Sequence, residues 1–278
     1  MSFLNPRTDI VFKKVFGNAA HTDILINFLN SVLERTEGQR IVKVVITDPY
    51  NHPETIHSKS SIVDISCTDQ KDAHYIVEMQ IINRNDFLER CQYYVATALA
   101  RQVQKGDEYI TIDPVIFIGI LCFDLLESPE YFSHHLMLNA KTHEHALKHA
   151  EFHFIEIKKF NKKLHELVTD CDKWVYFLKN ANDLETVPAE LKKPAAVQKA
   201  FTILEQSNWT NKELDAYERA MDLSREKFVY TDTAYKEGMQ EKARETALKL
   251  LKLNILDVVT IAQTTGLTVA EVEKLKKH

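Results

Sequence analysis

The stretch "DISCTDQKDAHYIVEMQ", residues 64–80, decides the fold of this 278-residue chain. Alternating polar and apolar residues on both sides of a polar segment predict two antiparallel strands joined by a tight turn. If the turn centres on residue 71, Asp64 lies opposite Glu78, with Cβ atoms about 5 Å apart. Gln80 follows Glu78 by two residues and therefore points to the same face. The sequence thus predicts that two acids and an amide converge on one spot.

Two facing carboxylates repel each other, and each raises the pKa of the other unless a cation lies between them. Mg²⁺ prefers oxygen ligands and is commonly held by one or two carboxylates, so Asp64 and Glu78 could form such a site. An ordinary structural role is the alternative. Asp64 could be a charge at a strand edge, and Glu78 and Gln80 could lie on the solvated face of a sheet.

The composition indicates a globular protein, because 45% of the residues are hydrophobic and 27% are charged. A net charge of -5 argues against nucleic-acid binding over the whole surface, although it allows a local basic groove. The four cysteines are scattered, which favours reduced thiols. The longest apolar run, residues 115–123, is too short to span a membrane. We therefore expect a cytoplasmic protein with no membrane partner.

The segments around the hairpin predict a mixed sheet in an α/β fold. Helix 21–36 and strand 40–47 precede it, and helix 84–106 and buried strand 115–123 follow it. The direct hairpin is antiparallel, whereas the later strand–helix–strand passage can form a parallel crossover.

Later patterns predict three parts of the chain. Residues 1–160 would form the core, including an added strand pair within 131–157. Residues 161–235 would be a helical region, and 236–278 a charged helix with a small helical module. These C-terminal helices are candidates for homo-oligomer formation.

Several segments together resemble the Rpn family of recombination-promoting nucleases and transposase-like proteins, in the PD-(D/E)xK nuclease superfamily. The segments are "LNPRTDIVFKKVFGN", "SIVDISCTDQKDAHYIVEMQ", "FLERCQYYVATALARQVQKGDEY", "PVIFIGIL" and "AQTTGLTVAEVEKLKK". The resemblance spans nearly the whole chain. It implies a restriction-endonuclease-like core with a helical C-terminal extension, and a metal-dependent DNA endonuclease in a recombination context. The alternative is a degenerate nuclease fold that binds DNA or a protein.

The resemblance also implies roles for the hairpin residues. Asp64 and Glu78 would bind Mg²⁺ or another divalent cation, and all three polar residues of the hairpin would be catalytic. Gln80 would replace the lysine that helps position the attacking water. Because Gln80 is neutral, it can orient water but cannot stabilise negative charge, so the activity could be weak.

Four further residues match family positions. Asp9 could approach the site from the first helix, although an acid at a helix N-terminus is favourable in its own right. Arg90, Tyr94 and Gln102 can share one face of helix 84–106. Arg90 could bind a phosphate, while Tyr94 and Gln102 support the site. Packing roles are the alternative.

Two other clusters have simpler interpretations. Four histidines lie close together in the sequence: His143, His145, His149 and His153. They suggest a zinc site only if the segment is helical. However, "EFHFIEI" alternates as a strand does, which favours a polar hairpin. Four lysines form a basic cluster: Lys158, Lys159, Lys162 and Lys163. They could contact DNA phosphates, although such runs are usually solvated.

Overall fold

The structure is a computed structural model. It describes residues 3–47, 50–51, 61–83, 85–104, 106 and 108–276. The chain forms two compact units, Met1–Ala220 and Met221–His278.

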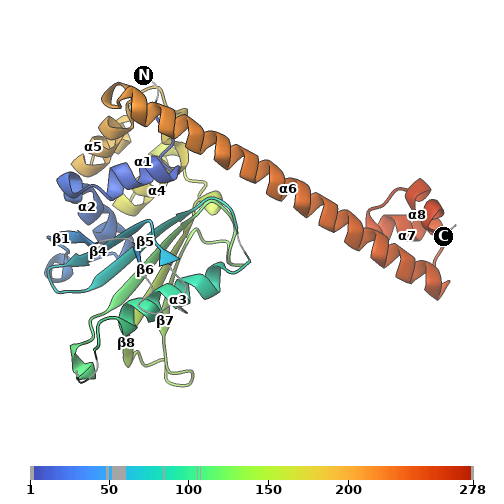
Figure 1. The fold of residues 1–278 in the computed structure, drawn as a ribbon, viewed down its shortest axis with the longest axis horizontal. Helices are drawn as coiled ribbons and strands as arrows, with labels where there is room; N and C mark the ends of the chain where they lie inside the picture. Colours follow the sequence, from blue (N-terminus) through green and yellow to red (C-terminus); the bar gives the residue numbers. More distant parts are fainter. Residues whose placement is uncertain are drawn as a thin grey trace. The chain divides into compact units, whose positions relative to one another are not determined.

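A six-stranded mixed sheet forms the centre of the first unit (Figure 1). β4 pairs antiparallel with β5, whereas β5, β6 and β8 are parallel to one another. The edge strands β1 and β7 are antiparallel to their neighbours. The strand order is β1 (Val44–Thr47), β4 (Ile65–Asp69), β5 (His74–Gln80), β6 (Val115–Leu121), β8 (Leu147–Glu156) and β7 (Phe132–Met137). A separate pair consists of β2 (Tyr50–Asn51) and β3 (Ser61–Ile62).

The β4–β5 hairpin has the expected register. Ile65 pairs with Val77, so the turn centres on residue 71 and Asp64 comes opposite Glu78. The Asp69 side chain fixes the turn, because its Oδ1 accepts hydrogen bonds from the backbone N–H groups of residues 71 and 73 at 2.7 and 3.1 Å. Residues 61–69 form two strands with an interruption between them, β3 and β4, and Asp64 lies in a bend just before β4.

Helices cover both faces of this sheet (Figure 1). Side chains alternate between two hydrophobic clusters, with Val77 and Ile118 in one and Ile76 and Phe117 in the other. The first cluster includes helices α1 (Asp9–Phe16), α2 (Thr22–Val32), α4 (Asp170–Asn180) and α5 (Ala195–Leu204). The second includes α3 (Phe87–Ala100). Because both faces are covered, every residue of β6 is buried.

The hydrophobic cluster that includes α1 and α2 also includes residues beyond position 160. Trp174 of α4 is fully buried, and its Nε1 donates a 2.9 Å hydrogen bond to Oδ1 of Asn27 in α2. Phe177 and Phe201 add an aromatic contact between α4 and α5. The C-terminal helices of this unit therefore complete the same hydrophobic core as the N-terminal ones.

The second unit has a small core of its own. Its residues are Ala247, Ile261, Ala262, Leu267 and Val272. The helices are α6 (Asn211–Leu253), which begins in the first unit, α7 (Val258–Thr265) and α8 (Val269–Lys276). Gly266 ends α7 with a φ of 74°, a left-handed conformation that glycine adopts readily. In the part of the chain that the structure describes, no helix combines the length and apolarity that a membrane crossing requires.

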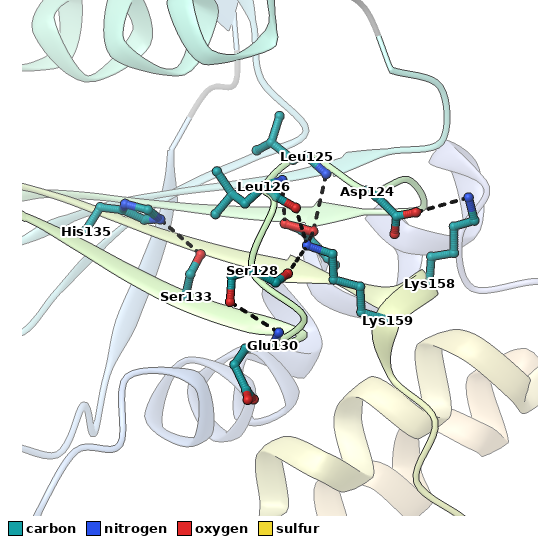
Figure 2. Close-up of polar contacts among 10 residues, drawn as sticks. Asp124, Leu125, Leu126, Ser128, Glu130, Ser133, His135, Lys158 and Lys159 are labelled. Carbon is teal, nitrogen blue, oxygen red and sulfur yellow. Dashed lines mark hydrogen bonds and ion pairs between the residues drawn. The ribbon is translucent and has the colours of Figure 1, made fainter. Parts of the chain in front are cut away.

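A buried ion pair anchors the loop that follows β6 (Figure 2). Glu156, at the end of β8, is 2% exposed and accepts hydrogen bonds from the backbone N–H groups of Leu125 and Leu126 at 3.2 and 3.1 Å. Lys159 pairs with Glu156 and donates 2.6 Å hydrogen bonds to the carbonyls of Leu126 and Ser128. The carboxylate and the ammonium are thus both satisfied inside the protein.

Replacing Glu156 with alanine should lower the free energy of unfolding by about 3–5 kcal/mol, because Lys159 would remain buried without its partner. Lys158→Ala is the matched control, since the Lys158–Asp124 pair at 3.2 Å is exposed on both sides. It should cost less than about 1 kcal/mol. Urea denaturation measures both values, and equal losses would contradict a dominant role for the buried pair.

A chain that ends at Ala220 should fold cooperatively, because each hydrophobic cluster of the described residues lies wholly on one side of this position. Contacts from the start of α6 are retained, including a 2.7 Å ion pair between Lys14 and Glu213. Thermal melting by circular dichroism should therefore show a single transition close to that of the full chain. A truncated protein without a cooperative transition would refute this division.

Candidate functional site

Asp64 and Glu78 meet where the β4–β5 hairpin opens. The backbone N–H of Met79 donates a 2.7 Å hydrogen bond to Oδ2 of Asp64, and the N–H of Asp64 donates to Oε1 of Glu78 at 3.2 Å. Glu78 is only 3% exposed, and the side chain of Asp64 is 18% exposed. The hairpin therefore holds two acids side by side in a place that water barely reaches.

Burial of this acid pair changes its protonation. Burial, together with the nearby charge of Asp9, raises the pKa of Asp64 to about 6. Burial and then the charge of Asp64 raise the pKa of Glu78 to about 8. Ionising both acids near neutral pH is therefore costly in the protein alone, and a bound cation would remove that cost.

Gln80 links this acid pair to Arg90. Its Nε2 donates a 2.8 Å hydrogen bond to Oε2 of Glu78, and its Oε1 accepts one from Nη2 of Arg90 at 3.1 Å. Nε of Arg90 also lies 3.5 Å from Oδ1 of Asp86. An amide suits this position because it can donate to the carboxylate and accept from the guanidinium at once. A lysine could only donate.

Helix α1 brings Asp9 and Lys13 to the same site. Nζ of Lys13 lies 2.7 Å from Oδ1 of Asp9 and 3.8 Å from Oδ1 of Asp64. Burial alone would lower the pKa of Lys13, but Asp9, Asp64 and Glu78 together raise it. Lys13 is a site residue that the sequence motifs do not mark. Its position one helical turn after Asp9 is the only signal that could have pointed to it.

The residues expected on α3 divide into two groups. Arg90 and Tyr94 lie near the acids, since burial and then the charge of Glu78 raise the pKa of Tyr94. Gln102 lies elsewhere: its amide binds the backbone of Asp113, just before β6, at 2.6 and 3.2 Å. Gln102 lies beyond the last residue of α3, Ala100, and its expected support of the site stays a prediction.

Two of the four clustered lysines serve the fold. Lys159 pairs with Glu156, and Nζ of Lys162 lies 2.6 Å from Oδ1 of the fully buried Asp172. These two ammonium groups are therefore committed to internal acids. Lys158 is exposed in its pair with Asp124.

The donor chemistry of the site fits a hard divalent cation. Asp64 and Glu78 supply carboxylate oxygens, whereas Gln80 turns its amide nitrogen toward Glu78 and its amide oxygen toward Arg90. Such oxygen donors are those that Mg²⁺ prefers. The raised pKa values supply an electrostatic reason for a cation to bind here.

A mixed sheet covered by helices, in an α/β fold with a helical C-terminal part, is consistent with a PD-(D/E)XK nuclease. The family model described as "PD-(D/E)XK nuclease family transposase" matches residues 6–234, and the chain belongs to this family. Comparisons with curated proteins and with solved structures give no match. Nucleases of this kind generally use divalent metal ions.

The acid pair predicts a pH-dependent loss of stability in metal-free protein. Both pKa values are higher in the folded state than the ordinary values of 3.8 and 4.5, so the folded protein binds more protons. The stability that these bound protons contribute is fully present below the ordinary pKa values, and it is lost as the pH rises through about 8.

Glu78→Gln should therefore stabilise the metal-free protein by an amount on the order of a few kcal/mol at alkaline pH. The gain should vanish at acidic pH, where Glu78 is protonated in the wild type. Urea denaturation across the pH range measures the difference between the two proteins. Glu89→Gln, an exposed change on α3, is the control. A Glu78→Gln gain that did not change with pH would contradict the raised pKa.

Proposed function

We propose that this protein is a Mg²⁺-dependent DNA endonuclease of a recombination or transposition system. The observation that carries the proposal is the buried contact between Asp64 and Glu78 at the end of a rigid hairpin. The family described as nuclease and transposase supports phosphodiester cleavage, with DNA as the substrate. When bound, a divalent ion can activate water and stabilise the charge that develops on a phosphodiester.

The side chains around the acid pair have separate roles in this proposal. Asp64 and Glu78 hold the metal ion. Gln80 keeps the Glu78 carboxylate oriented through its 2.8 Å hydrogen bond and can orient a water molecule. Tyr94 supports this arrangement from α3.

Two cations supply the positive charge that Gln80 lacks. Arg90 contacts the Gln80 amide at 3.1 Å, and Lys13 lies 3.8 Å from Asp64. Arg90, whose side chain is 20% exposed, can offer N–H donors to a phosphate at the site. Asp9 holds Lys13 in position through their 2.7 Å ion pair.

The second compact unit supports a further part of the proposal, self-association. Several apolar side chains are exposed there: Leu253, Ile255, Leu256, Val259 and Val269. A second copy of the chain could cover them. Light scattering should then give a smaller oligomer for the chain that ends at Ala220 than for the full chain.

Cleavage by site variants tests the enzymatic proposal directly. Asp64→Asn and Glu78→Gln keep the shape of each side chain but remove its charge, so each should slow Mg²⁺-dependent nicking of supercoiled plasmid by about a hundredfold or more. Glu89→Gln, which removes an exposed acid from α3, should leave the rate unchanged.

Circular dichroism of each variant separates loss of chemistry from loss of folding. Full nicking by either folded site variant would refute the assignment of the acid pair. A wild-type protein that binds DNA in Mg²⁺ but never cuts it would instead support the degenerate DNA-binding alternative.

A further inference from the structure

A second group of metal-ligating side chains lies on β7 and β8. Nε2 of His134 and Nε2 of His153 are each 3.6 Å from Oε2 of Glu151. The two imidazole rings stack with centroids 4.0 Å apart. One potential ligand atom from each residue lies within 4.8 Å of the others. Three ligands from two paired strands therefore surround one point.

His153 is the most unusual member of this group. It is 3% exposed, yet among the residues that the structure describes neither of its ring nitrogens has a hydrogen-bond partner. The 3.6 Å separation from Glu151 is too long for a hydrogen bond. Buried polar atoms are nearly always satisfied, so an unsatisfied imidazole beside a carboxylate indicates a missing ligand such as an ion.

The donor types favour a transition metal over Mg²⁺. Two imidazoles and one carboxylate form a known zinc ligand set that leaves a fourth position for water. His134 is partly exposed, so such a position can reach solvent.

This group is separate from the acid pair. In the sheet, Glu78 pairs with Gly119 of β6, which in turn pairs with Phe154 of β8. Because side chains alternate along a strand, His153 points to the face opposite that of Phe154 and Glu78. The acid pair and the histidine group thus lie on different faces, with β6 between their strands.

We propose that His134, Glu151 and His153 form a Zn²⁺ site that joins the edge strand β7 to β8. The site lies next to an irregularity in their pairing, between Leu136 and Met137. An edge strand is hydrogen-bonded to the sheet on one side only. A metal ion bound to residues of both strands would therefore strengthen their pairing.

Zn²⁺ titration of the full chain, freed of metal by chelation, tests this proposal. Calorimetry and thermal melting should show one bound Zn²⁺ and a higher melting temperature. The Glu78→Gln protein, in which the acid pair is weakened, should keep this Zn²⁺. His134→Gln should bind it at least tenfold more weakly, and Glu151→Gln should do the same.

His135→Gln is the matched control. His135 is next to His134 in the chain, but its ring contacts Phe154 on the other face of the sheet. It should bind Zn²⁺ as the wild type does. The proposal is overturned if the wild type binds no Zn²⁺, if the folded His134→Gln and Glu151→Gln proteins bind it equally well, or if Glu78→Gln abolishes binding. None of these results depends on whether the protein cleaves DNA.

Discussion

The candidate site depends on the pairing between β4 and β5. A slip of one residue would turn every side chain of one strand to the other face, and Asp64 would no longer meet Glu78. The Asp69 turn and the burial of both sheet faces make such a slip costly. The same pairing sets the position of Gln80 and therefore its link to Arg90.

The buried acids of the described residues fall into two kinds. Glu156 and Asp172 each have a lysine beside them. Burial alone would raise the pKa of Asp172, but hydrogen bonds from Lys162 and its other partners lower it to about 2. Glu78 is bonded only to an amide and a backbone N–H, and its pKa rises to about 8. The first kind stabilises the fold, whereas the second is the kind to which we propose that a cation binds.

Local patterns in the sequence were sufficient to predict the hairpin, its register and the mixed sheet. Strand alternation and the turn residues act over only a few positions, so the register about residue 71 and the facing positions of Asp64 and Glu78 follow from the sequence. Gly266, which ends α7, is likewise a local signal. The family resemblance was confirmed over residues 6–234.

Only the tertiary structure decided which distant residues join these elements. Lys13 reaches Asp64 because α1 packs against the sheet, and Gln102 binds the backbone of Asp113 just before β6. His134 meets His153 because of the register in which the consecutive strands β7 and β8 pair. No period in the sequence encodes such contacts, since they depend on how helices and strands pack together. The sequence determined the local geometry of the acid pair, and packing determined its electrostatic surroundings.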